Sequence, residues 1–251
     1  RKRYLDLIMN SEVRKIFETR AIILEVMREF MKKKKFVEVE TPLLQTIYGG
    51  ALAKPFKTHC DAYNSDVYLS IAPELFLKKA QVGGFENVYE ITKKFRNEGV
   101  DRQHNPEHMT IEWYQAYADY NDGMDLFEEL IKTIAKKLFG KLIFKYQGHK
   151  INLAKWRRVP ILKAIKENLN EDISRVKSDA EAKKIAKKHG IEPTGITKTI
   201  LADELMKLFR HKLIQPTFLI DYPIELAPLA KPNKKDPTKA EVFQPFVGGM
   251  E

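Results

Sequence analysis

The sequence is organised around Phe95-Arg96-Asn97-Glu98-Gly99 and the stretch His104-Asn105-Pro106-Glu107-His108-Met109-Thr110-Ile111-Glu112-Trp113-Tyr114. Ahead of the first part, apolar residues are interleaved with Glu90, Thr92 and Lys94. After the second part, β-branched and aromatic residues dominate as far as Tyr120. This pattern predicts two strands joined by a long polar loop, which is a hairpin with a charged tip.

One face of this hairpin carries an unusual set of charges. Side chains alternate across a strand, so Glu112 and Tyr114 share a face with Thr110, Ala116 and Ala118, while Ile111, Trp113 and Tyr117 share the other. Arg96 and Glu98 point to a common side. With small alanines leaving space, this face resembles the floor of a pocket for a substrate that has an ammonium group and a carboxylate or phosphate. An ordinary amphipathic hairpin with solvated charges is the alternative.

Composition sets the outer limits. A chain of 251 residues with 43% hydrophobic content can form one large domain, or one domain with a small insertion. No apolar run approaches the roughly 20 residues that cross a bilayer, and nothing at the start marks secretion. The single cysteine, Cys60, excludes an internal disulfide and fits a reducing compartment. We therefore expect a soluble, cytoplasmic protein without membrane contact.

The net charge of +10 favours an anionic partner such as nucleic acid. Lysine-rich helices can give the same balance without that meaning, and the lysines here are scattered rather than gathered in one arm. Between residues 141 and 215 they lie in segments with helical spacing, which contain no group of catalytic residues. We interpret these residues as a peripheral insertion whose lysines form a solvated face, in preference to an RNA site.

Further elements follow from local patterns. Residues 11–34 have helical apolar spacing, and residues 36–42 alternate as a strand that ends at Pro42. Taken alone, these two could be a helix packed on an edge strand. Pro73 is expected to open a helix with Glu74 in its first turn. A helix over 121–139 ending at Gly140, and strands over 217–223 and 242–247, complete the pattern.

The stretch Phe95–Glu98 with the loop His104–Glu107 resembles motif 2 of the class II aminoacyl-tRNA synthetases, and is most similar to their lysine enzymes. The helix, strand and Pro42 resemble motif 1, which forms the dimer in that family. The resemblance implies an α+β fold with a class II aminoacyl-tRNA synthetase-like antiparallel sheet, flanked by helices and interrupted by a helical insertion. With the lysine-rich residues 141–215 taken as a mostly helical insertion, we expect a catalytic core with motifs 1 and 2 at residues 1–140 and a return to the sheet at 216–251. The phrase beginning at Arg1 resembles the entry into the catalytic domain, and the chain is expected to stop before motif 3.

The same resemblance implies a lysine–tRNA ligase that activates lysine with ATP to lysyl-adenylate and transfers it to tRNA(Lys), acting as a homodimer. Arg96 would bridge the carboxylate and the α-phosphate as the catalytic residue. The matching positions for ATP are Arg96, Asn97, Glu98, His104, Asn105 and His108, and those for lysine are Gly50, Glu74, Glu112 and Tyr114. Glu251 would hold Mg²⁺. The family usually has phenylalanine at the position of His108, and its aspartate and asparagine enzymes tend to carry glutamine at that of Glu74.

Other nucleotide-dependent classes lack their motifs here. The sequence has no glycine-rich phosphate loop, no His-Ile-Gly-His phrase of class I synthetases and no His/Cys cluster with zinc spacing. Two other interpretations stay open beside the tRNA enzyme. One is a truncated, inactive fragment that dimerises or binds a ligand, and the other is a synthetase-like ligase that attaches lysine to a protein.

Overall fold

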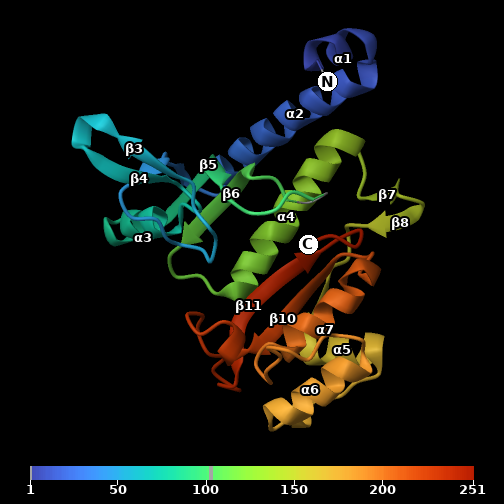
Figure 1. The fold of residues 1–251 in the computed structure, drawn as a ribbon. Helices are drawn as coiled ribbons and strands as arrows, with labels where there is room; N and C mark the ends of the chain where they lie inside the picture. Colours follow the sequence, from blue (N-terminus) through green and yellow to red (C-terminus); the bar gives the residue numbers. More distant parts are fainter. Residues whose placement is uncertain (1, 102–103) are drawn as a thin grey trace. The chain divides into compact units, whose positions relative to one another are not determined.

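A computed structural model describes residues 2–101 and 104–251, so Arg1 and residues 102–103 lie outside the described part of the chain. The chain divides into two compact units. One unit comprises residues 23–118, and the other combines residues up to Ile22 with residues 119–251. Each unit mixes helices with small, mainly antiparallel sheets, which confirms the predicted α+β class (Figure 1).

The predicted hairpin forms the centre of unit 23–118. Its strands are β5 (Asn87–Phe95) and β6 (Glu107–Gln115), which pair antiparallel, while the short β1 (Val37–Glu38) pairs parallel with β5. In this register Glu90 lies opposite Glu112 and Lys94 lies opposite His108, so these four side chains share one face of the sheet.

The strand is shorter than the sequence predicts at its far end. β6 stops at Gln115, and Tyr117 adopts a left-handed backbone with φ of 58°. Because a residue in that conformation turns the chain out of the ladder, the expected alternation through Ala116 and Ala118 is wrong. These alanines belong to the turn after the hairpin.

A second sheet and one helix accompany the hairpin. Strands β2 (Leu44–Gln45), β4 (Ser65–Leu69) and β3 (Lys57–Cys60) pair antiparallel in that order, and a short 3-10 turn, η1 (Asp61–Tyr63), joins β3 to β4. Helix α3 (Glu74–Val82) starts directly after Pro73, as predicted, and packs on β5 and β6. Figure 1 shows α3 beside the sheet strands of this unit.

The N-terminal helices are α1 (Arg3–Met9) and α2 (Ser11–Lys33). α2 confirms the predicted helix and buries Val26, Phe30 and Met31 in its second half. The strand predicted over residues 36–42 shrinks to β1, because Thr41 turns its backbone N–H and hydroxyl to Glu90 and Pro42 has no N–H to give a ladder.

The other unit is built on β11 (Lys239–Phe246), β10 (Thr217–Pro223) and β9 (Arg157–Pro160), with β10 between the other two. Helix α4 (Tyr120–Phe139) covers one face, where Phe127 meets Phe218 edge-on. Leu219 points to the opposite face and packs with α5 (Ile161–Leu169) and α7 (Leu201–Phe209). Gly140 ends α4 with φ of 66°, as predicted, and Asp119, for which no cap was predicted, accepts N–H bonds at the start of the helix.

The first part of the predicted helical insertion is instead made of strands. Residues 141–160 contain the hairpin β7 (Ile143–Tyr146) and β8 (His149–Asn152), followed by β9, which joins the sheet of β10 and β11. Helices begin only at α5, and α6 (Asp179–Lys188) lies between α5 and α7; the remaining 3-10 turns are η2 (Ile173–Arg175), η3 (Arg210–Lys212) and η4 (Ile224–Leu226). The expected boundaries at 140 and 215 are therefore not boundaries of the compact units. Short strands with interspersed lysines lack the apolar alternation that would have revealed them.

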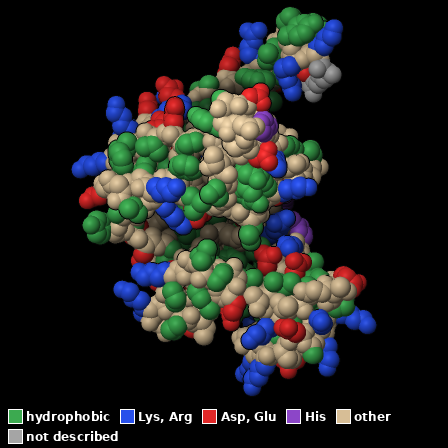
Figure 2. Space-filling model, turned by 60° about the vertical axis from the view of Figure 1, so that its left-hand side comes forward, with side chains coloured by type: hydrophobic (Ala, Val, Ile, Leu, Met, Phe, Trp, Pro, Cys, Tyr) green, Lys and Arg blue, Asp and Glu red, His purple; other side chains and the backbone are tan. Residues whose placement is uncertain are grey.

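The surface has mixed charge. On the face drawn in Figure 2, lysine and arginine side chains are dispersed among acidic ones. Across the described residues, no helix combines the length and the apolar character that a membrane span requires.

Candidate active site

A half-buried acidic group lies on the predicted pocket face of the hairpin. The hydroxyl of Tyr114 donates to Oε1 of Glu112 at 2.9 Å, and both side chains are half-buried. Burial raises the pKa of Glu112 above the usual value for a carboxyl, the Tyr114 hydrogen bond opposes that rise, and the charge of Glu74 adds to it. A cation close to Glu112 would therefore stabilise its charged form.

Glu74 reaches the same place from the first turn of α3. Its carboxylate pairs with Nζ of Lys78 at 2.6 Å, and that ammonium lies 5.9 Å from the centre of the Tyr114 ring. The structure therefore brings Glu74, Glu112 and Tyr114 together, as predicted, and adds Lys78, which the sequence analysis missed. Its spacing of four residues from Glu74 on a predicted helix was the available signal.

Gly50 lies against the beginning of α3. Its φ is 87°, and a Cβ at this position would come within 2.9 Å of Cβ of Glu74 and 3.3 Å of Cβ of Ala72. A glycine is required here for both the backbone angle and the close approach. Gly50 is thus next to Glu74, in the group where the sequence places it.

The loop end of the hairpin encloses a hollow of about 320 Å³. It is lined by Arg96, Glu98, Gly99, His104, Asn105, His108 and Met109. Five of the six positions predicted for the nucleotide therefore line one cavity. The sixth, Asn97, has an exposed side chain and does not line it; its backbone N–H donates to the carbonyl of Lys54 at 2.7 Å.

Arg96 has a donor that awaits a partner. Within residues 2–101 and 104–251, its Nε is buried and makes no hydrogen bond. An unpaired buried donor is costly, and a planar guanidinium fits the oxygens of a carboxylate or phosphate. The hollow is thus suited to an anionic group beside Arg96.

One face of β6 leads from the hollow to the acidic group, although Met109 on the opposite face also borders the hollow. His108, Glu112 and Tyr114 are separated by even numbers of residues on β6, so they project from the same face. The loop is held by its own contacts, since Asp101 accepts from the backbone N–H of His104 at 2.8 Å and lies 2.7 Å from its Nδ1.

Comparison with known proteins identifies the family. The family model described as class II tRNA synthetases (D, K and N) matches residues 1–251. The chain belongs to this family. It is 48% identical to a lysine–tRNA ligase of Pelotomaculum thermopropionicum, 49% to one of Carboxydothermus hydrogenoformans and 46% to one of Thermotoga maritima. Each match covers 100% of this chain and 51%, 52% and 50% of the relative, so the chain spans about half the length of these curated relatives.

A buried ion pair that the sequence analysis missed lies on the same sheet face as Glu112. Nζ of Lys94 is 3.8 Å from Oε2 of Glu90, and the side chains are 1% and 3% exposed. Glu90 accepts the N–H and the hydroxyl of Thr41 at 2.8 and 2.7 Å. Strand alternation places both residues on the face of Glu112, and the sequence shows this. The sequence does not show that both side chains are buried.

The residues present do not assemble a metal site around Glu251. Its carboxylate lies 3.8 Å from Nη1 of Arg210. In the described part of this synthetase chain, no three His, Cys, Asp or Glu side chains are grouped to hold a metal ion. The predicted Mg²⁺ role of Glu251 therefore receives no support from this geometry.

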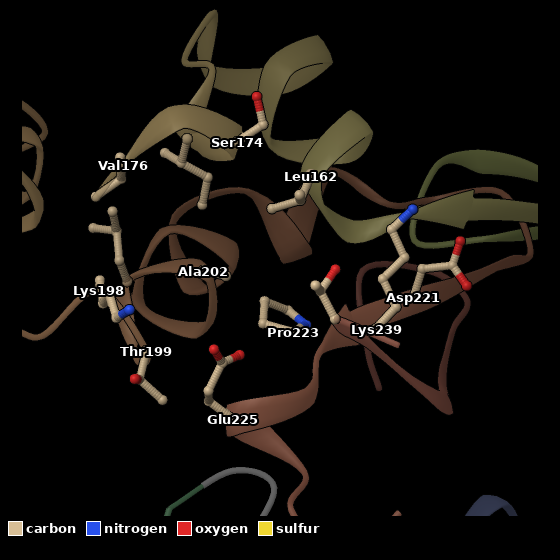
Figure 3. A pocket seen from close by; sticks show the side chains of 13 residues that line it. Leu162, Ser174, Val176, Lys198, Thr199, Ala202, Asp221, Pro223, Glu225 and Lys239 are labelled. Atoms are coloured by element: carbon tan, nitrogen blue, oxygen red, sulfur yellow. The ribbon is translucent and has the colours of Figure 1, made fainter. Parts of the chain in front are cut away.

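A separate hollow of about 210 Å³ lies in the unit of residues 119–251 (Figure 3). It is bordered by Asp221, where β10 bulges and φ is 58°, and by Glu225, Lys198 and Lys239. Its floor is apolar, with Leu162 and Ala202. No residue of this hollow was predicted as part of the synthetase site.

Proposed function

We propose that this chain forms part of the catalytic domain of a lysine–tRNA ligase, which activates lysine with ATP and transfers it to tRNA(Lys). The observation that carries this proposal is the presence of two features along the same hairpin. One is the hollow with the unpartnered Nε of Arg96, and the other is the acidic group of Glu112, Tyr114 and Glu74. Together they suit an anionic nucleotide beside a cationic amino acid.

The acidic group would select lysine by charge. Glu74 and Glu112 would meet ammonium groups of the substrate, Tyr114 would orient the Glu112 carboxylate, and Gly50 would let the backbone approach. An uncharged amino acid would not give the half-buried carboxylate of Glu112 the ammonium partner that lysine supplies, and a site built for a charged partner discriminates strongly against a substrate that lacks it. This explains lysine in preference to a neutral amino acid.

The chemistry would depend on position and charge. The lysine carboxylate attacks the α-phosphorus of ATP, a P–O bond forms, and pyrophosphate leaves. The guanidinium of Arg96 would bind oxygens of both reacting groups and oppose the charge that grows on the phosphate. A 3′-terminal hydroxyl of tRNA then attacks the adenylate carbonyl and AMP leaves.

The nucleotide would be held by the remaining residues of the hollow. Glu98, His104, Asn105 and His108 would contact ATP, whereas Asn97 would act through its backbone bond to Lys54. Mg²⁺ would neutralise phosphate charge when bound, as is typical of the family. Glu251 stays a predicted ligand only, and no step above depends on it.

The proposal includes a cytoplasmic homodimer. Exposed apolar side chains along α1 and the first half of α2 support the dimer, and they are Tyr4, Leu5, Ile8, Met9, Ile16 and Phe17. A run of this kind is typical of a protein interface.

Lysine-dependent exchange of pyrophosphate into ATP tests the activation step. We would measure it with the 251-residue chain and with a chain extended to the length of its relatives, offering lysine, aspartate, asparagine and methionine separately. Exchange that requires lysine is the expected result. Exchange with another amino acid, or none in either chain, would overturn the proposal.

A further inference from the structure

We propose that Lys94 is a positioning residue of the lysine site: a buried internal cation that balances its carboxylates and fixes the segment that carries Glu74. This inference rests on the function proposed above. Lys94 does not border the hollow, and no step of the chemistry uses it.

Lys94 forms an ion pair with Glu90, but the two side chains make no direct hydrogen bond. The separation of 3.8 Å between Nζ and Oε2 exceeds a hydrogen bond, and both Glu90 oxygens already accept hydrogen bonds from Thr41. The ammonium donates instead to Oγ of Ser70 at 3.0 Å. A buried charge needs nearby charges of the opposite sign. Because Lys94 makes no hydrogen bond to Glu90, a second carboxylate can also stabilise its charge.

Ser70 transmits the contact to the start of α3. Its Oγ accepts from Lys94 and from Nε2 of Gln45 at 3.0 Å, and it donates to the carbonyl of Ala72 at 3.2 Å. Two residues further along, Glu74 begins the helix. Lys94 therefore supports the short segment that aims Glu74 at the site.

The second carboxylate is Glu112. The charged and titratable groups that face it are Tyr114 from its own strand, Glu90 and Lys94 from β5, and Glu74 and Lys78 from α3. Burial raises the pKa of Glu112 and the charges of Lys94 and Lys78 lower it. Burial in turn lowers the pKa of Lys94, while Glu90 and Glu112 raise it. Lys78 is 53% exposed and already paired with Glu74, so Lys94 is the buried cation that favours a charged Glu112.

The consequence concerns pH. Without Lys94 the pKa of Glu112 would rise further, so Glu112 would take up a proton at a higher pH and lose its attraction for the substrate ammonium. We expect lysine binding in the variant to weaken at a pH where the wild-type protein still binds. ATP binding, which depends on Arg96 and the loop, should not follow this change.

The test compares three variants, Lys94→Gln, Lys94→Met and Lys93→Met. Lysine and ATP binding to each is measured by calorimetric titration between pH 5.5 and pH 9. Glutamine is included because it can keep the hydrogen bond to Ser70 without the charge. Lys93 is the matched control, because it is adjacent, 56% exposed and paired with Glu107. We expect both Lys94 variants to move the acidic limb of lysine binding upward by about one pH unit, with roughly fivefold weaker binding at the wild-type midpoint, and ATP binding to change less than about twofold. Lys93→Met should match the wild type.

Folding is checked separately, because removing one member of a buried pair can destabilise a protein strongly. Lys94→Gln retains a donor for Ser70, so its circular dichroism and melting curve should show a folded chain even if Lys94→Met does not. A folded Lys94→Gln whose lysine profile superimposes on that of the wild type would overturn the role of Lys94 alone. A wild-type protein that binds no lysine at any pH would overturn this role together with the proposed function.

Discussion

Arg96 is the residue for which the structure gives the strongest reason for an anionic ligand, since its buried Nε has no partner among the described residues. We predict that Arg96→Ala lowers lysine-dependent pyrophosphate exchange by about 100-fold or more, the usual effect of removing a donor that stabilises transition-state charge. Arg96→Lys should recover only a small part, because an ammonium lacks the planar fork. Exchange in Arg96→Ala within a few-fold of wild type would remove Arg96 from its assigned role.

Glu112 should affect one substrate and not the other. We predict that Glu112→Gln weakens lysine binding by roughly 10- to 100-fold, the value of a hydrogen bond to a charged group, and leaves ATP binding nearly unchanged. Glu107→Gln is the matched control, because Glu107 is on the same strand but pairs with Lys93 at the exposed end. Titration of both variants with lysine and ATP decides the matter, and equal lysine affinity in Glu112→Gln and wild type would contradict the pocket assignment.

At the residue scale, alternation along the strands was sufficient to place Glu112, Tyr114 and the charged loop. It was not sufficient for Glu90 and Lys94. A charged residue between apolar ones usually marks a solvated face, and only the tertiary fold shows that Glu90 and Lys94 are buried. Lys78 was missed because only its helical partner Glu74 was considered as a site residue.

The contact between the glycine loop and α3 is an element-scale feature that a pair of glycines can test. Gly50 and Gly84 both have positive φ, 87° and 105°, but only Gly50 has neighbouring atoms within 4 Å of an added Cβ. We predict that each alanine substitution lowers stability by about 1–3 kcal/mol through backbone strain, and that Gly50→Ala alone also weakens lysine binding. Thermal melts and lysine titrations of both variants test this. Equal effects on binding would show that the approach to Glu74 is unimportant.

Elements with strong local signals were predicted well. α2, α4 and β10 have a cap, a long apolar period or a β-branched run, and these signals act within a few residues. The strands between residues 141 and 160 were not predicted, because each has only four residues and takes its stability from pairing with distant segments.

At the scale of the whole molecule, the exposed apolar residues of α1 and α2 predict self-association. Phe17 is 49% exposed on the surface of α2. We predict that Phe17→Lys shifts the protein from dimer towards monomer in sedimentation velocity, because a charge would be buried without a partner. Val82→Lys, at an exposed apolar position on α3, is the control and should leave the sedimentation coefficient unchanged. A wild-type protein that is monomeric at all concentrations would contradict the dimer.

The division into units could not be predicted from the sequence. The unit of residues 119–251 also takes in residues up to Ile22, so it joins segments nearly a hundred residues apart. The local periodicity of a sequence gives no information on contacts between distant segments. The synthetase fold was predicted from the resemblance to a family, which does not require those contacts to be known. The expected domain boundaries were inferred from a change in composition, and composition follows exposure more closely than it follows packing.

Lys54 connects the two loops that would hold different substrates. Its carbonyl accepts the N–H of Asn97 at 2.7 Å, and its own N–H donates to Oε1 of Glu98 at 3.3 Å. Ordering of the glycine loop by lysine would thereby restrict the nucleotide loop, and thermodynamic reciprocity requires ATP to assist lysine by the same factor. Lysine alone should then slow deuterium uptake at the Asn97 amide. Such slowing would show that the two substrates bind cooperatively before any bond between them is formed.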